Sequence, residues 1–397
     1  MCGAVDLKIS KRISALEPSA TLAVMARAKA MREAGVDVVA LAAGQPDFDT
    51  PQHIKDAAIA ALNAGDTKYV SPAVGKNELR DAVCGYFKTY GGLDYERAQI
   101  AVGIGAKDLC HQAFAAVLDP GDEVIIPVPY WVSYPEQVKL AGGVSVFVEG
   151  GDGPVSNLGP EQLRAAITPR TRMLVLNSPS NPSGKIYSRS ELEALAAVLR
   201  ETEIVVLSDE IYHRLSNGDA PAPSVASLAG MIERTITING VSKSYAMTGW
   251  RLGFAGGPAV LIEAMGKVVQ QTTSGAVSFV QTAAIAALTG DQSCVDTMRA
   301  AYRERGETMW RALTAIPGID CEQPQGGFML FADVSGTFER LGVSSAAGFA
   351  EQVLEQVHVA VIPGEAFGVA THVRFSFATG MDVIEEGMRR LSGLLAK

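Results

Sequence analysis

Cysteine is scarce in this sequence, and its spacing excludes two kinds of protein. There are five cysteines in 397 residues, an odd number, and no two of them form a Cys-x-x-Cys pair. They stand at Cys2, Cys84, Cys110, Cys294 and Cys321. Disulfide-stapled domains and structural zinc sites need closely spaced cysteines. We therefore expect a reducing, cytoplasmic compartment and no metal site.

Long apolar runs and an excess of basic residues are also missing. No uninterrupted apolar run reaches the roughly 18 residues that a membrane-spanning helix needs, and the N-terminal MCGAVDLKIS lacks the apolar stretch of a signal peptide. The 34 Lys and Arg are outnumbered by 43 Asp and Glu, which gives a net charge of −9. Nucleic-acid-binding proteins draw most of their affinity from a basic face. We expect neither a membrane nor a nucleic acid as a partner.

The common nucleotide-binding motifs are absent as well. Gly103 and Gly105 precede a predicted helix, and glycines at such a position can present backbone N–H groups to a phosphate. The third glycine of G-x-G-x-x-G is missing, however, and so is the P-loop pattern G-x-x-x-x-G-K-[ST]. No acidic residue ends a second strand about 20 residues further on, as a dinucleotide site requires. The sequence disfavours a NAD site and leaves phosphate binding open.

What the sequence does contain is a large apolar fraction, 48%, arranged in short runs. At roughly 150 residues per domain, the length suggests two or three domains. Near-continuous apolar runs predict buried strands at 124–127, 145–148, 173–176, 204–207 and 235–238. Helical patterns lie between them at 107–118, 160–167 and 190–200, the last with Ser190 as its N-cap. This alternation predicts an α/β fold with a mostly parallel central sheet flanked by helices.

After residue 257 the pattern changes to longer helices. Helices are predicted at 277–288 and 295–315, and two further strands at 327–332 and 373–377. We therefore divide the chain into a large domain, residues 45–290, and a small α+β domain. The small domain is assembled from both ends of the chain, residues 1–44 and 291–397.

Polar residues follow several of the predicted strands. Asn181 lies in the run NSPSNPSG, Asp209 and Tyr212 lie in SDEIY, and Lys243 follows the strand at 235–238. Taken singly, Asn181 fits a turn, Asp209 a helix N-cap and Lys243 a solvated lysine. Ligands of parallel sheets, however, bind beyond the carboxyl ends of the strands. The joint placement of these residues predicts a site at that edge of the sheet.

The segment GVSKSYAMTGWRLG, residues 240–253, resembles the pyridoxal-phosphate attachment region of class I/II aminotransferases, with Arg251 eight residues after Lys243. Other segments also match that family, and they stand in the same order along the chain. They are AGQPDF at 43–48, TKY at 67–69, PYWVSYP at 129–135, NSPSNPSG, SDEIY, and HVR at 372–374. The chain resembles most the bacterial aspartate/prephenate aminotransferases. The resemblance implies the fold type I of pyridoxal-phosphate-dependent transferases, pyridoxal 5′-phosphate as cofactor, and ping-pong transfer of an amino group to a 2-oxo acid.

The resemblance also implies a role for each matching residue. Lys243 would form the Schiff base and move the proton from the substrate Cα. Asp209 would pair with the pyridine nitrogen, while Asn181 and Tyr212 would bond the phenolic oxygen. Further cofactor contacts are implied for Trp131 and Ile211 on the two faces of the ring, for Gly105, Ala106, Lys107, Ser242 and Arg251 at the phosphate, and for Tyr69 at the phosphate of a neighbouring subunit. The last contact implies a homodimer with shared sites.

On the substrate side, the resemblance implies that Arg374 grips the α-carboxylate with help from Asn181, Trp131 and the backbone at Gly44. Lys107, together with Ser19 and Thr21, would contact the distal carboxylate of an acidic amino acid. The alternative is that Lys107 merely belongs to the phosphate turn and that Ser19 and Thr21 merely cap the first helix.

Several positions depart from the family pattern, Asp108 and Met329 among them. Asp108 replaces the usual glutamine and could partly neutralise Lys107, and Met329 replaces a tyrosine. These departures leave open a second hypothesis, a β- or γ-elimination, replacement or cyclisation enzyme on the same scaffold. A transcription regulator built on such a domain would need a winged-helix segment before Gly44, and we expect none.

Overall fold

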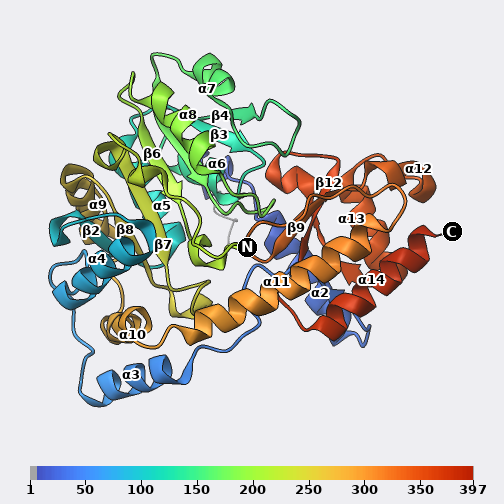
Figure 1. The fold of residues 1–397 in the computed structure, drawn as a ribbon, viewed down its shortest axis with the longest axis horizontal. Coiled ribbons are helices and arrows are strands. Elements are labelled where there is room, and N and C mark those ends of the chain that lie inside the picture. The colour runs from blue at the N-terminus through green and yellow to red at the C-terminus, as the bar shows by residue number, and fades with distance from the viewer. Residues whose placement is uncertain (1–6, 397) are drawn as a thin grey trace, which may run out of the picture.

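The computed structural model describes residues 7–396, and its main feature is a seven-stranded sheet (Figure 1). Its strands are β2 (Ile100–Gly103), β3 (Glu123–Val128), β4 (Val144–Glu149), β5 (Thr171–Asn177), β6 (Val205–Asp209), β7 (Thr235–Gly240) and β8 (Gly253–Gly256). Their order across the sheet is β2-β8-β7-β6-β5-β3-β4. Neighbouring strands are parallel except where β8 pairs with β7 and β2. The predicted mostly parallel α/β sheet is confirmed.

Helices cover both faces of this sheet, because successive side chains of a strand point to opposite faces. The covering helices are α5 (Ala106–Val117), α6 (Ser133–Leu140) and α9 (Ala259–Thr272) on one face, and α7 (Pro160–Ala166) and α8 (Arg189–Leu199) on the other. Val124 and Ile126 of β3 pack with the first group, and Ile125 between them packs with the second. Burial on both faces is the physical reason for the near-continuous apolar runs.

Two details of the predicted elements are wrong. β4 is not buried: Val144 and Phe147 are each 49% exposed, because β4 is the edge strand and pairs only with β3. The N-cap of α8 is Ser188, not Ser190. The Ser188 hydroxyl accepts from the Glu191 backbone N–H at 3.2 Å, and the Glu191 carboxylate accepts from the Ser188 N–H at 2.7 Å. Ser190 cannot be the cap because the helix already begins at Arg189.

A third helical layer packs beside β2 and β8, at the lower left of Figure 1. It consists of α3 (Gln52–Asn63), α4 (Asn77–Gly91) and α10 (Ser278–Thr289). The long helix α11 (Ser293–Thr314) then crosses from this side of the molecule to the C-terminal part of the chain.

No helix among residues 7–396 is both long and apolar enough to cross a membrane.

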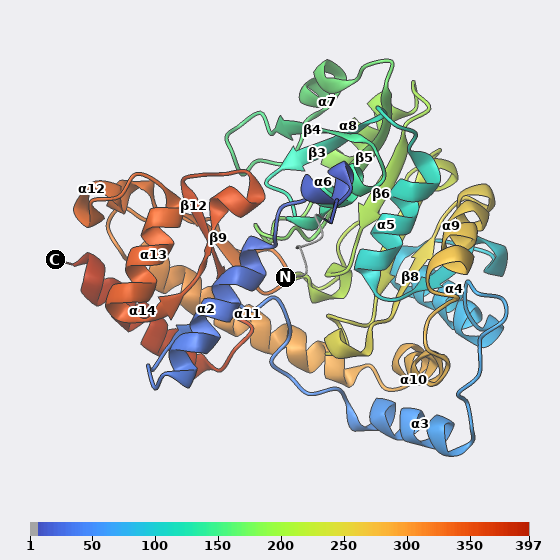
Figure 2. The same cartoon turned by 180° about the vertical axis from the view of Figure 1, so that it is seen from behind.

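The second, smaller region combines both ends of the chain. Its strands are β1 (Val39–Ala40), which pairs in parallel with β10 (Val359–Ala360), and an antiparallel sheet of β11 (Ile362–Pro363), β12 (His372–Ser376) and β9 (Met329–Asp333). Its helices are α2 (Ala20–Glu33), α12 (Phe338–Leu341), α13 (Ala346–Val357) and α14 (Met381–Leu395), and the short α1 (Lys11–Ser14) precedes them. Figure 2 shows α2 against this region. The exact domain limits, 1–44, 45–290 and 291–397, stay a prediction.

Candidate active site

A cavity of about 420 Å³ opens where the parallel strands end. β5 ends at Asn177, β6 ends at Asp209, and Ser242 and Lys243 follow β7. The cavity is lined by Thr21, Leu22, Met25, Ala42, Gly44, Ala106, Lys107, Trp131, Tyr134, Asn177, Asn181, Asp209, Ile211, Tyr212, Ser242, Lys243, Thr248, Arg251 and Arg374. The strand-end residues of the large sheet thus meet residues of α2 and β12 from the smaller region.

Asp209 is the carboxylate of the cavity, and it is only 4% exposed. Its Oδ2 accepts from the Tyr134 hydroxyl at 2.7 Å, and its Oδ1 accepts from the Ile211 N–H at 3.2 Å. Burial raises the pKa of Asp209, while these two hydrogen bonds and the charge of Lys243 act to lower it. The two hydrogen bonds fix the orientation of the carboxylate without neutralising it.

Lys243 lines the same cavity as Asp209, and its amine donates to the carbonyl oxygen of Gly44 at 2.5 Å. Burial lowers its pKa to about 8, and the positive charges of Arg374 and Arg251 add to this effect. The rings of Tyr212 and Phe328 lie 5.9 and 5.7 Å from the amine. A lysine in such surroundings has an appreciable neutral fraction near neutral pH and can act as a nucleophile or a base.

Arg374 is the buried cation of the site, at 3% exposure. One of its terminal nitrogens donates to Asn181 Oδ1 at 3.0 Å and the other to the Ala42 carbonyl at 3.1 Å. Burial lowers its pKa to about 10, and its Nε has no hydrogen-bond partner. A buried guanidinium with spare donors and no carboxylate partner is suited to an anionic ligand.

Asn177 links these groups. Its Oδ1 accepts from the Asn181 N–H at 2.8 Å, and its Nδ2 donates to the Asp209 carbonyl at 2.9 Å. Because Asn177 ends β5 and Asp209 ends the adjacent β6, the two strand ends and the turn that holds Asn181 are held in one arrangement.

The turn before α5 and the segment around Arg251 form the anion-binding side. Gly105 has φ +86°, and a Cβ there would lie 2.8 Å from Nη2 of Arg251. Arg251 itself is held by a 2.8 Å bond from its Nη1 to the Thr248 carbonyl. The first backbone N–H groups of a helix have no partner within it, and at other helix N-termini such groups bind anions.

Aromatic side chains enclose the cavity. The Lys107 amine lies 4.9 Å from the ring centroid of Trp131, and partial burial, together with the charge of Arg251, lowers the pKa of Lys107. Ile211 and Tyr212 are buried, and Tyr212 packs edge-on against Phe328 at 5.4 Å.

Asp108, which could have partly neutralised Lys107, is bonded elsewhere. Asp108 Oδ2 accepts from the Ile104 N–H at 2.8 Å and from Gln112 Nε2 at 2.7 Å, so that it holds the turn before α5. Within residues 7–396, Lys107 takes part in no ion pair. Met329 is likewise not at the cavity; it is buried in the core of the smaller region.

Three predicted residues do not line the cavity. Tyr69 lies on the segment between α3 and α4 and is 93% exposed. Gly105 is the N-cap of α5, and the cavity lining begins at the next residue, Ala106. Ser19 sits at the N-cap position of α2 but makes no side-chain cap bond; its hydroxyl lies 2.8 Å from that of Thr21, which does line the cavity.

Several residues of the cavity were missed by sequence reasoning. They are Leu22 and Met25 of α2, Ala42, Tyr134, Asn177 and Thr248. Tyr134 had a usable signal, because it lies three residues after Trp131 and this spacing places both on one side of a helical turn. Asn177 acts through its side-chain amide, and its place at the end of a predicted strand was a usable signal. Leu22, Met25, Ala42 and Thr248 carry no such signal.

Comparison with known proteins identifies the family of this chain. The family model for aminotransferase class I and II matches residues 36–391. The chain is 47% identical to an aspartate aminotransferase of Geobacillus stearothermophilus, over 97% of this chain and 98% of that one. It is 46% identical to an aspartate/prephenate aminotransferase of Nitrosomonas europaea, over 98% and 100% of the two chains.

A solved structure is equally similar. The aspartate aminotransferase of Thermus thermophilus with maleate superposes with a TM-score of 0.92 at 43% identity, over 98% of this chain and 100% of that one. The chain belongs to the family of class I and II aminotransferases and has their fold type I architecture.

Proposed function

We propose that this aminotransferase uses pyridoxal 5′-phosphate and moves the amino group of an acidic L-amino acid, such as aspartate or glutamate, to a 2-oxo acid. The observation that carries the proposal is the charge distribution of the cavity. Four cationic side chains, Lys107, Lys243, Arg251 and Arg374, surround the single buried carboxylate of Asp209. A phosphorylated cofactor with a basic ring nitrogen and a substrate with two carboxylates match that distribution.

The residues present fit the cofactor. The Gly105 turn is so close to Arg251 that a side chain would fill the space between them, and the N-terminus of α5 supplies further donors for a phosphate. Asp209 would hold the ring nitrogen protonated, Asn181 and Tyr212 would bond the phenolic oxygen, and the remaining cofactor contacts are proposed for Trp131, Ile211, Ala106, Lys107 and Ser242. When bound, pyridoxal phosphate supplies an electron sink that weakens the bonds at the substrate Cα.

Lys243 does two things in this proposal. Its amine would hold the cofactor through the aldehyde carbon, and it would also take the proton from the substrate Cα and deliver it to that carbon of the cofactor. Both tasks need the neutral amine, and a pKa near 8 makes that form accessible. Asp209 would pair with the ring nitrogen and would take no part in this proton transfer.

The substrate is proposed to bind by its two ends. Arg374, oriented by Asn181 and Ala42, would take the α-carboxylate. Lys107 would take the distal carboxylate, with Thr21 beside it and Ser19 supporting Thr21. The Thermus relative with maleate, a dicarboxylate, supports this arrangement.

The elimination or replacement alternative is not favoured. Its two motivating residues, Asp108 and Met329, have structural contacts away from the reacting groups. The similar proteins reported above are aminotransferases.

We further propose a homodimer in a cytoplasmic compartment. Tyr69 projects fully into solvent and contributes nothing to the cavity of its own chain, as expected of a residue that completes the phosphate site of a neighbour. The thiols of Cys84, Cys110, Cys294 and Cys321 are free, which suits reducing conditions. Sedimentation of the active enzyme at the mass of one chain would contradict the dimer.

A donor and acceptor screen tests the proposed reaction. The protein is loaded with pyridoxal phosphate, offered single amino acids with 2-oxoglutarate or oxaloacetate, and its products are identified by mass spectrometry. Lys243→Ala is the inactive variant, and Lys267→Ala, on the exposed side of α9, is the matched control. We expect aspartate and glutamate to be the best donors. Failure of every diacid, or full activity of Lys243→Ala, would contradict the proposal.

A further inference from the structure

Tyr134 is the one buried hydroxyl that contacts the carboxylate of the site. It is the second residue of α6, and its side chain is 1% exposed. Its hydroxyl donates to Asp209 Oδ2 at 2.7 Å, the shorter of the two hydrogen bonds that the carboxylate accepts. Its ring packs edge-on against Trp131, with centroids 5.2 Å apart and planes at 83°. One side chain therefore touches both the carboxylate and the aromatic wall of the cavity.

The Tyr134 hydroxyl that donates to the Asp209 carboxylate is an uncharged donor. Within residues 7–396, Asp209 forms no ion pair within 4.0 Å, so no arginine or lysine neutralises it. Burial and the adjacent carboxylate raise the pKa of the Tyr134 phenol well above its ordinary value, which keeps the hydroxyl a donor. A neutral donor stabilises the ionised carboxylate and leaves its charge available for a cationic ring nitrogen.

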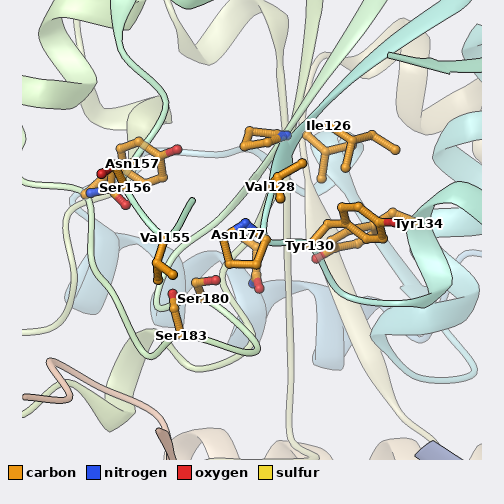
Figure 3. A pocket seen from close by; sticks show the side chains of 14 residues that line it. Ile126, Val128, Tyr130, Tyr134, Val155, Ser156, Asn157, Asn177, Ser180 and Ser183 are labelled. Carbon is orange, nitrogen blue, oxygen red and sulfur yellow. The ribbon is translucent and has the colours of Figure 1, made fainter. Parts of the chain in front are cut away.

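Tyr134 lies between two cavities. Figure 3 shows it beside a second, small cavity of about 30 Å³, whose lining includes Asn177, Ser180 and Ser183. Tyr134 and Asn177 line both this cavity and the main one. They form the wall between the two, and each is bonded to Asp209, Tyr134 at the carboxylate and Asn177 at the carbonyl.

We propose that Tyr134 is a positioning residue of this aminotransferase, which holds the Asp209 carboxylate ionised and aimed at the ring nitrogen of the cofactor. It acts through Asp209 and not on the substrate. This inference rests on the proposed use of pyridoxal phosphate.

The test compares Tyr134→Phe with Tyr130→Phe. Both changes remove one phenolic oxygen from the same loop-to-helix segment, but Tyr130 stacks on Phe147 at 4.8 Å and does not contact Asp209. The first readout is the ¹⁵N NMR shift of pyridoxal phosphate labelled at its ring nitrogen, followed as the pH is raised. We expect the nitrogen of Tyr134→Phe to lose its proton at lower pH than in the wild type, and that of Tyr130→Phe to match the wild type.

The second readout is the rate of the half-reaction with glutamate. A hydrogen bond to a charged group contributes one to two factors of ten to an equilibrium, so we expect Tyr134→Phe to slow the half-reaction about tenfold to a hundredfold. Because Tyr134 acts through Asp209, the same change in an Asp209→Asn background should alter the rate by less than about twofold. The apparent KM for glutamate should stay near the wild-type value.

The outcomes distinguish a failure of the proposed function from a failure of the positioning role of Tyr134. If the wild type neither binds pyridoxal phosphate nor transaminates, the proposed function fails. If the wild type is active but Tyr134→Phe matches Tyr130→Phe in both readouts, or if its effect is undiminished beside Asp209→Asn, the positioning role is wrong. Should Tyr134→Phe not fold, Tyr134→Leu provides the test, because leucine has no group that can donate to Asp209. A ring-nitrogen titration of that variant that is unchanged from the wild type would equally overturn the role.

Discussion

Replacing Lys107 by methionine tests the substrate assignment most sharply. The Lys107 amine lies at the cavity, 4.9 Å from the ring centroid of Trp131, and has no carboxylate partner within the described chain. Its charge is therefore free to meet a distal carboxylate of the substrate. Methionine keeps the length and the apolar contact with the indole while it removes the charge.

The size of the effect follows from the contact that is lost. A hydrogen bond to a charged group contributes about 1.5–3 kcal/mol, and about 1.4 kcal/mol corresponds to a factor of ten. Because the Lys107 side chain is accessible to solvent, the lower end of the range applies. We expect kcat/KM for aspartate to fall about tenfold to thirtyfold, with little change for phenylalanine.

The assay is the ratio of kcat/KM for aspartate to kcat/KM for phenylalanine, measured with one acceptor and saturating cofactor. The ratio cancels any effect of Lys107 on cofactor binding. Lys139→Met, on the outer side of α6 and paired with Glu136, is the matched control. An equal fall for both donors would refute the assignment and leave Lys107 as a residue of the phosphate turn.

Two further predictions concern the cofactor turn and the pH dependence of stability. Gly105→Ala should weaken binding of pyridoxal phosphate at least about tenfold in a fluorescence titration, because the added Cβ meets Arg251 at 2.8 Å. Gly35→Ala is the control: it carries a similar backbone strain, at φ +88°, but has open space around it, and this variant should bind pyridoxal phosphate normally. An equal loss of affinity in both variants would contradict a phosphate site between Gly105 and Arg251. Burial raises the pKa of Glu210 from 4.5 to about 7, so the folded chain keeps a proton that the unfolded chain loses. The free energy of unfolding should therefore decline by about 3 kcal/mol as the pH rises from about 4.5 to above 7, and Glu210→Gln should remove this decline in urea titrations; an unchanged decline would contradict the reasoning.

The central sheet and the gathering of most predicted site residues at one cavity could be predicted from the sequence, for a physical reason. β3, β5, β6 and β7 are buried on both faces. Their apolar runs can therefore be recognised from the local sequence alone, without knowledge of their neighbours in the sheet. The polar residues after them must converge, because parallel strands end at one edge.

Features that depend on neighbours could not be predicted. β4 has the composition of a buried strand, and only its place at the edge of the sheet exposes Phe147. The short glycine-rich strands β2 and β8 give no periodic signal. The direction of the Asp108 side chain depends on the turn at Ile104, and the contact of Tyr134 with Asp209 joins residues 75 positions apart.

The central claim is that Lys243 is the amine that holds the cofactor. Incubation with pyridoxal phosphate, reduction with borohydride and peptide mapping test it directly. We expect one reduced adduct, on Lys243, formed at a rate that rises with pH through about 8 as the buried amine loses its proton. A single adduct on any other lysine, with Lys243 unmodified, would contradict the account.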